Sequence, residues 1–125
     1  AQSEHFGEIR DEVVQLLKYI HDMELSEIDK AIKRCQAYKL EINDYLDIFM
    51  IWYRDVLLYK ATGDESKITF QDEKMIIKRL ATECSYHGLD TIIQAQRTAR
   101  RRIACNGNYN LAIELMLLSI KENIA

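Results

Sequence analysis

The fold is decided by the stretch Asp44–Gly63, which reads DYLDIFMIWYRDVLLYKATG. Apolar residues recur in it at spacings of three and four, the period of one wide helical face. That face consists of Ile48, Phe49, Trp52, Val56 and Leu57. The other faces are also mostly apolar, so we expect this helix to be buried on more than one side, in a core or against a partner. Three charged residues, Asp47, Arg54 and Asp55, make it too polar for a bilayer span.

The composition supports a helical fold for the whole chain. The chain has 125 residues, enough for one domain with a single core. It contains no proline and only four glycines, whereas a sandwich or barrel needs many turns. We therefore predict an all-α fold: a single compact bundle of about six helices that spans residues 1–125.

Six helical segments follow from the apolar spacing and the turn residues. We expect them at Glu4–Met23, Glu27–Tyr38, Ile42–Ala61, Asp72–Tyr86, Asp90–Ala104 and Leu111–Asn123. The first buries Ile9, Val13, Leu16, Leu17 and Ile20, and the only long loop is Asp64–Phe70.

Short polar residues and glycines predict where these helices begin and end. Ser26 and Asp29 are typical of an N-cap for the second helix. Gly63 ends the third helix, and Gly88 is a natural stop for the fourth. Asn106-Gly107-Asn108 forms a tight turn, after which Asn108 or Asn110 caps the sixth helix.

Charge and cysteine usage indicate a cytoplasmic protein without a global attraction to nucleic acid. The net charge is −3 at neutral pH. Cys35, Cys84 and Cys105 are an odd set without CxxC spacing, which favours reduced thiols. The charged amino end leaves no room for a signal-peptide core, and the chain lacks an initiator Met. We expect it to be part of a longer protein.

No motif for catalysis, cofactor binding or metal binding is present. The phosphate-binding patterns G-x-x-x-x-G-K-[ST] and G-x-G-x-x-G are missing. Cys84 and His87 have the spacing of a metal pair, but no second pair accompanies them, so we interpret them as a packed thiol beside a surface histidine. We expect no catalytic residue, no cofactor and no metal in this chain.

The cluster Trp52-Tyr53-Arg54-Asp55 is interpreted as structural. Adjacent helical residues project about 100° apart, so Arg54 and Asp55 do not face each other as a catalytic pair would. Each is expected to pair with another helix or to lie at an interface edge. Trp52 and Tyr53 are expected in the core, although both would be strong anchors at a protein interface.

The run Arg97-Thr98-Ala99-Arg100-Arg101-Arg102 predicts a basic helix face. With Ile92, Ala99 and Ile103 inward, Arg97 and Arg101 point outward, Arg102 lies on the flank and Arg100 lies nearer the core edge. No aromatic residue interleaves these arginines, which disfavours a nucleic-acid site. Contact with an acidic protein partner stays open.

The segment Ile51–Gly63, IWYRDVLLYKATG, resembles the C-terminal domain of the bacterial DNA polymerase III delta-prime subunit, a clamp-loader component. In that family, a helix with the pattern W-[YF]-R-D-[LV]-L leads into a loop and a further helix pair. Residues 100–118, with Asn106-Gly107-Asn108 and then Leu111, are similar to the family's N-x-N-x-x-L ending. The resemblance spans Ile42–Ile120.

This resemblance implies a non-catalytic oligomerisation domain in the collar of the clamp loader, which loads the sliding clamp in DNA replication. The implied partners are the helical collar domains of the gamma/tau and delta subunits, with no membrane and no tight nucleic-acid contact by this domain. The AAA+ modules that hold ATP lie outside this chain, so neither the family's ATP-site arginine nor its zinc segment is assigned to a residue here. Membership in the gamma/tau or delta families is the lesser alternative.

Two other functions stay open from the sequence alone. One is a free-standing helical adaptor that binds a peptide or protein, and the other is a small helical nucleic-acid binder that uses Arg97, Arg101 and Arg102. The collar interpretation predicts exposed apolar surface on the third, fifth and sixth helices. The candidate interface or structural residues are Trp52, Tyr53, Arg54, Asp55, Arg97, Arg101, Asn106 and Asn108.

Overall fold

Six α-helices form the computed structural model, which describes residues 4–105 and 107–123. They are α1 (Glu4–Tyr19), α2 (Leu25–Cys35), α3 (Ile42–Thr62), α4 (Lys74–Glu83), α5 (Tyr86–Ala104) and α6 (Tyr109–Glu122). Short 3-10 turns lie at Ile20–Asp22, Gln36–Glu41, Glu65–Lys67 and Gln71–Glu73. The described residues contain no strand, and the predicted all-α bundle of about six helices is confirmed.

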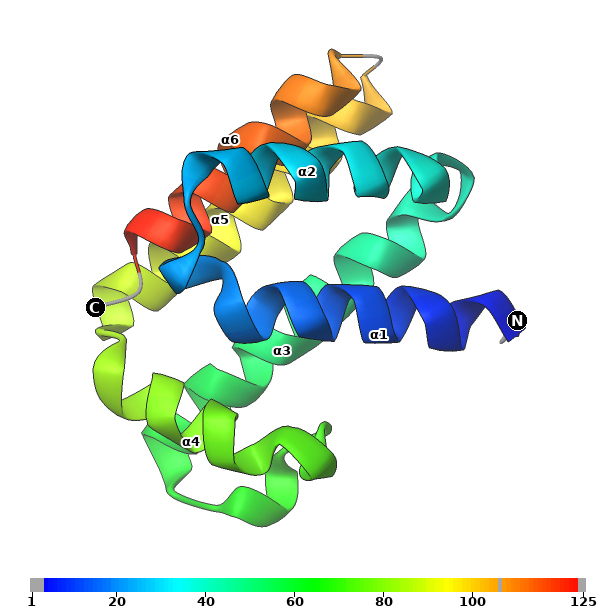
Figure 1. The fold of residues 1–125 in the computed structure, drawn as a ribbon. Coiled ribbons are helices and arrows are strands. Elements are labelled where there is room, and N and C mark those ends of the chain that lie inside the picture. The colour runs from blue at the N-terminus through cyan, green and yellow to red at the C-terminus, as the bar shows by residue number, and fades with distance from the viewer. Residues whose placement is uncertain (1–3, 106, 124–125) are drawn as a thin grey trace.

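Helix α3 lies at the centre of the bundle. It contacts α1, α4 and α5, while α6 packs along α5 and α2 packs on α6. Figure 1 shows α5 and α6 side by side, with α2 in front of them and α4 at the opposite side of the molecule.

The central position of α3 explains its apolar composition. Trp52, Phe49 and Val56 are completely buried, and Ile48 is nearly so, as its spacing predicts. Leu57, expected on the same face, is only half-buried. Within the described part of the chain, no helix is both long and apolar enough to cross a membrane.

The first two helices differ from the predicted boundaries. The inward residues of α1 are buried as predicted, but the α-helix ends at Tyr19 and a 3-10 turn buries Ile20. Helix α2 begins at Leu25, so the predicted N-cap at Ser26 is wrong. Glu24 is the cap, and it forms a reciprocal capping box with Glu27 that satisfies donors of the first turn.

The prediction that Gly88 stops the fourth helix is also wrong. Helix α4 ends at Glu83, and the hydroxyl of Ser85 accepts a 2.9 Å hydrogen bond from the backbone N–H of Gly88, which lies in the first turn of α5. A Cβ at Gly88 would lie 2.8 Å from the carbonyl oxygen of Asn123. The glycine therefore permits close approach of the end of α6.

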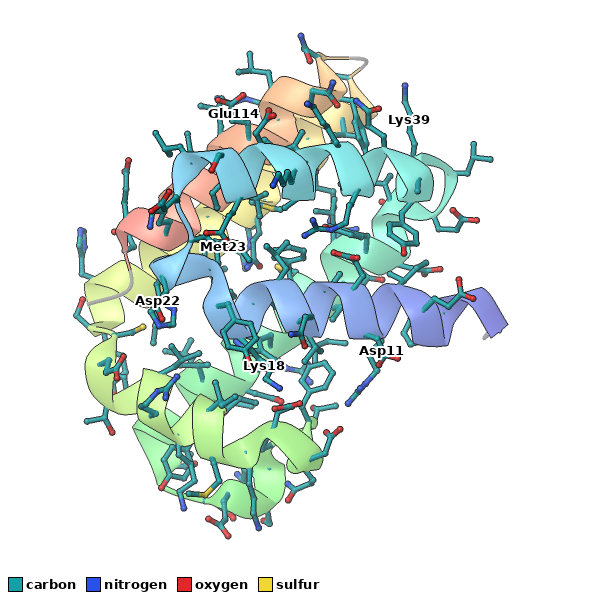
Figure 2. The ribbon with its side chains drawn as sticks, in the orientation of Figure 1. Asp11, Lys18, Asp22, Met23, Lys39 and Glu114 are labelled. Atoms are coloured by element: carbon teal, nitrogen blue, oxygen red, sulfur yellow. The ribbon has the colours of Figure 1, made fainter. Side chains whose placement is uncertain are left out.

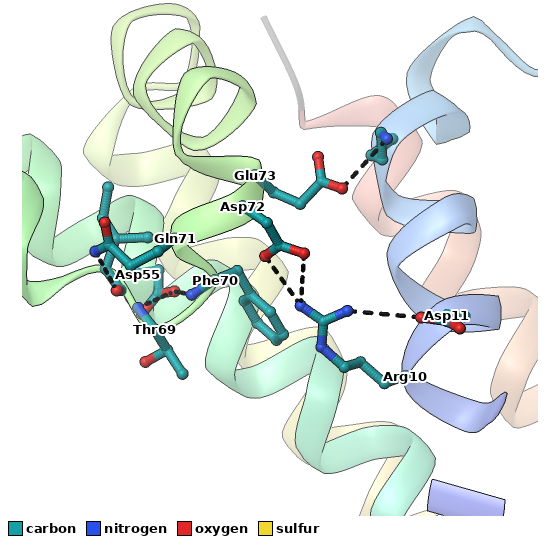
Figure 3. Close-up of polar contacts among 10 residues, drawn as sticks. Arg10, Asp11, Asp55, Thr69, Phe70, Gln71, Asp72 and Glu73 are labelled. Atoms are coloured by element: carbon teal, nitrogen blue, oxygen red, sulfur yellow. Dashed lines mark hydrogen bonds and ion pairs between the residues drawn. The ribbon is translucent and has the colours of Figure 1, made fainter. Parts of the chain in front are cut away.

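The segment after α3 is a structured connection. Gly63 ends α3 with a φ of 69° and donates its N–H to the carbonyl oxygen of Tyr59, as its position predicts. Ile68 and Phe70 from this connection enter the core. The guanidinium of Arg10 on α1 binds Asp72 at 3.0 Å and lies over the ring of Phe70 (Figure 3), so α1 holds the connection in place.

Candidate partner-binding surface

A surface groove lies between α3 and α5. Its lining consists of Met50, Ile51, Arg54, Leu57, Ile93 and Arg97, and its volume is about 280 Å³. Ile51, Leu57 and Ile93 pack on the core from the outside and remain partly exposed. An apolar floor with a charged rim is typical of a protein–protein contact. We call this surface the α3–α5 groove.

The two arginines of the α3–α5 groove have no ionic partner among the described residues, which leaves their charge available. Both Arg54 and Arg97 are exposed. By contrast, Arg100 binds the carboxylate of Asp47 at 2.8 Å and the amide oxygen of Asn43 at 3.2 Å. The groove therefore presents apolar surface together with positive charge that the domain does not itself neutralise.

The arginine run on α5 is oriented as its sequence predicts. Arg97, Arg101 and Arg102 are exposed, and Arg100 is half-buried. Arg101 donates a 3.3 Å hydrogen bond to the hydroxyl of Thr98 on the same helix. Arg97 belongs both to this run and to the α3–α5 groove, which joins the two features into one surface.

The four residues of the Trp52–Asp55 cluster separate into a buried and an exposed part. Trp52 and Tyr53 are fully buried, in agreement with the core role predicted for them. The Trp52 ring packs against Phe70, with centroids 5.7 Å apart. Burial raises the pKa of the Tyr53 hydroxyl far above its ordinary value. Only Arg54 reaches the surface, where it borders the groove.

Asp55 anchors the connection after α3. Its side chain is 1% exposed, and Oδ2 accepts hydrogen bonds from the backbone N–H groups of Thr69 at 2.8 Å and Phe70 at 3.2 Å (Figure 3). The predicted partner on another helix, or place at an interface edge, is therefore wrong for Asp55, whose partners are backbone N–H groups of the connection. The backbone N–H groups of Thr69 and Phe70 find their acceptor in the Asp55 carboxylate.

Comparison with known protein families identifies the domain. The family described as DNA polymerase III, delta subunit, C terminal matches residues 8–122. The chain belongs to this family. The resemblance to a clamp-loader subunit is thus confirmed at the level of the clamp-loader family. No curated protein and no solved structure matches the chain.

The second asparagine of the N-x-N turn in this clamp-loader domain caps a helix. Asn106 lies outside the described residues. Asn108 is the N-cap of α6, and its side-chain oxygen accepts a 3.0 Å hydrogen bond from the backbone N–H of Leu111. The alternative cap, Asn110, instead accepts a hydrogen bond from Gln36 of the segment after α2.

Two cysteines of the clamp-loader domain, Cys35 and Cys84, are buried. Among the described residues, no group of three His, Cys, Asp or Glu side chains is placed to hold a metal ion. Cys84 is buried, whereas His87 is exposed on α5. Cys35 lies 3.2 Å from the hydroxyl of Tyr109, and burial raises the pKa of its thiol, which disfavours the reactive thiolate.

Sequence reasoning did not single out the apolar lining of the α3–α5 groove. Met50, Ile51 and Leu57 were recognised only as part of a helix that is apolar on every side. That pattern was the available signal, because a single core rarely covers a whole helix. On α6, Leu111 and Leu115 are exposed, as predicted, whereas the apolar lining residues of α3 and α5 are half-buried. The most exposed large apolar side chains, those of Leu40, Met75 and Leu25, lie outside these three helices. The use of apolar surface on α3, α5 and α6 in binding stays a prediction.

Proposed function

We propose that this domain is the non-catalytic oligomerisation domain of the delta-prime subunit of the DNA polymerase III clamp loader. The family match over residues 8–122, which is described for the delta subunit, carries the clamp-loader part of the proposal. The sequence W-Y-R-D-V-L-L at Trp52–Leu58 and the Asn106-Gly107-Asn108 turn favour delta-prime within the clamp-loader family. Residues 1–125 would then form one collar domain, the C-terminal part of a longer cytoplasmic AAA+ protein.

The proposed mechanism is association through the α3–α5 groove. The partners would be the helical collar domains of the gamma/tau and delta subunits. Met50, Ile51, Leu57 and Ile93 would bury apolar surface, which supplies most of the affinity. Arg54 and Arg97, which lack an ionic partner within the described residues, would attract and orient an acidic neighbouring surface.

The remaining candidate residues would support this surface from behind. Trp52, Tyr53 and Asp55 are buried and keep α3 in a fixed position, so that Met50, Ile51 and Arg54 face outward. Arg101 extends the positive edge along α5. In this proposal the domain has no catalytic residue, cofactor or metal, and its contribution to replication is to hold subunits together during sliding-clamp loading.

Co-elution with the gamma/tau and delta collar domains in size-exclusion chromatography tests the proposal. At tens of micromolar we expect a complex with at least one of them. The double variant Met50→Glu/Arg54→Glu should lose it, because it places negative charge in the groove and removes one rim arginine. The control is Arg102→Glu, a charge reversal on an exposed arginine of α5 that does not line the groove.

Two outcomes would contradict the proposal. If folded partner domains elute separately from the wild-type domain, the collar function fails and a free-standing adaptor becomes the better interpretation. If the complex forms but resists the groove variant, another face makes the contact. Circular dichroism of each variant verifies that the change acts on binding and not on folding.

A further inference from the structure

A row of leucines runs along the outer face of α6. Leu111, Leu115 and Leu118 follow one another at spacings of four and three, which places them on one side of the helix. The core-facing side consists of Ala112, Ile113, Met116, Leu117 and Ile120. Leu111 is 49% exposed and Leu115 is 40% exposed, while Leu118 is half-buried beside α2, so the domain covers this apolar side of α6 only in part.

Two glutamates accompany these leucines. Glu114 follows Leu111 by three positions, and Glu122 follows Leu118 by four, so both lie on the same outer face. Both are exposed, and neither has an ionic partner among the residues that the structure describes. Figure 2 shows Glu114 on α6 beside α2. We call Leu111, Glu114, Leu115, Leu118 and Glu122 the leucine–glutamate ridge.

No positive charge on α6 neutralises the leucine–glutamate ridge. Lys121 is the basic residue of this helix, and its ammonium donates a 3.1 Å hydrogen bond to the carbonyl oxygen of His21. On α2, Asp29 borders the same depression as Glu114 and Leu118, but its charge is paired with that of Lys33 at 3.3 Å.

The leucine–glutamate ridge and the α3–α5 groove are complementary. The ridge projects apolar side chains beside unpaired carboxylates, and the groove presents apolar side chains beside the guanidinium groups of Arg54 and Arg97, which have no ionic partner in the described part of the chain. A helix can bind by laying an apolar face into a hydrophobic groove on its partner. Opposite charges at the rim select the partner and its orientation.

We propose that the leucine–glutamate ridge of one copy of this domain docks in the α3–α5 groove of a second copy. The two copies then contribute different surfaces, so the contact is heterologous. The proposal rests on the proposed function only in that both use the α3–α5 groove. Self-association covers the apolar groove in unassembled chains, and a collar partner must displace it.

A charge-exchange experiment tests this contact. Sedimentation velocity over a concentration series should show reversible association of the wild type. Arg97→Glu alone should weaken it by about tenfold or more, because the carboxylate introduced at this position then faces Glu114 of the next copy. Glu114→Arg alone should weaken it similarly. An equimolar mixture of the two variants should regain association, because the altered groove of one then meets the altered ridge of the other.

Two further variants show whether a loss of association comes from the contact itself or from a change in net charge. Leu115→Asp changes an exposed position of the ridge and should also weaken association. Arg102→Glu, outside both surfaces, should leave association unchanged. Thermal unfolding followed by circular dichroism identifies any variant that is not folded. If Glu114→Arg does not fold, Leu115→Asp tests the contribution of the ridge in its place.

The results separate this proposal from the proposed function. A wild-type domain that stays monomeric at about 1 mM, where contacts of millimolar affinity are populated, would overturn self-association. So would a mixture of the charge variants that associates no better than either alone. If collar partners still bind and the Met50→Glu/Arg54→Glu variant still loses them, the proposed function stands without self-association. If the domain self-associates but binds no collar partner, self-association stands and the proposed function fails.

Discussion

The carboxylate of Asp55 accepts a 2.8 Å hydrogen bond from the backbone N–H of Thr69, in the connection after α3. The same oxygen also accepts from the N–H of Phe70, whose ring then packs against Trp52. This anchor fixes the inward side of α3. Arg54, one residue earlier, is consequently directed to the surface at the α3–α5 groove. The three buried residues of the Trp52–Asp55 cluster thus position the exposed Arg54.

Replacing Asp55 by alanine should destabilise the domain by about 2–4 kcal/mol, because two backbone N–H groups, one of them buried, lose a charged acceptor. Asp55→Asn should cost less, since an amide oxygen can still accept both hydrogen bonds. Urea unfolding measures the difference. Asp47→Ala, at an exposed residue, is the control and should cost about 1 kcal/mol or less. Equal effects of Asp55→Ala and Asp47→Ala would refute the anchoring role.

Trp52→Ala should cost about 3–5 kcal/mol of unfolding free energy, as large aromatic truncations in cores do. Trp52 is 0% exposed, and its ring lies on the aromatic ring of Phe70. Chemical denaturation of the variant provides the value. Tyr19→Ala, at an aromatic residue that is 49% exposed, serves as the comparison and should cost much less. A loss below about 1 kcal/mol, together with lost partner binding, would assign Trp52 to an interface.

Tyr53→Phe should be nearly neutral or stabilising near neutral pH. The Tyr53 hydroxyl is buried and has no hydrogen-bond partner within the described residues, so its removal relieves a desolvation cost of about 1–3 kcal/mol. Urea midpoints of the two proteins at neutral pH measure the change. A clear destabilisation would mean that the hydroxyl makes a contact essential to the core.

Stability should fall at alkaline pH, and Tyr53→Phe should reduce the fall. Burial raises the pKa of Tyr53 and of Tyr45, so the folded domain keeps protons that the unfolded chain releases near pH 10. Their contribution is fully present below about pH 10 and is lost as the pH rises further. Urea unfolding at pH values on both sides of 10 tests this, with Tyr19→Phe as the exposed control. Identical pH profiles for wild type and Tyr53→Phe would contradict the assignment.

The arginine face of α5 should bind DNA only weakly. The net charge is −3, and no aromatic residue lies between the arginines to stack on a base. Fluorescence anisotropy with single- and double-stranded DNA at physiological salt should give dissociation constants on the order of 10⁻⁴ M or weaker. Tight binding that is abolished by Arg97→Glu together with Arg101→Glu would instead support a nucleic-acid-binding function.

Much of the fold could be predicted because apolar spacing is a local property. The helix at Asp44–Gly63, the inward face of the first helix and the stop at Gly63 all follow from residues that are close in sequence. One boundary that failed depends on a contact between residues distant in sequence. Gly88 has the pattern of a helix stop, but it lies in the first turn of α5. A glycine is required there because the backbone of Asn123, at the end of α6, comes close to it.

The candidate surface, too, depends partly on local sequence and partly on contacts between distant residues. The sequence alone determined that α3 is apolar on nearly every face and that Arg97 and Arg101 point outward, because the helical period places side chains by their spacing. Only the tertiary structure decided that Ile93 lies beside Ile51 and Leu57, that Arg54 and Arg97 border one groove, and that Arg100 is neutralised by Asp47. These contacts join helices far apart in the chain, and their geometry is set by how the whole core packs.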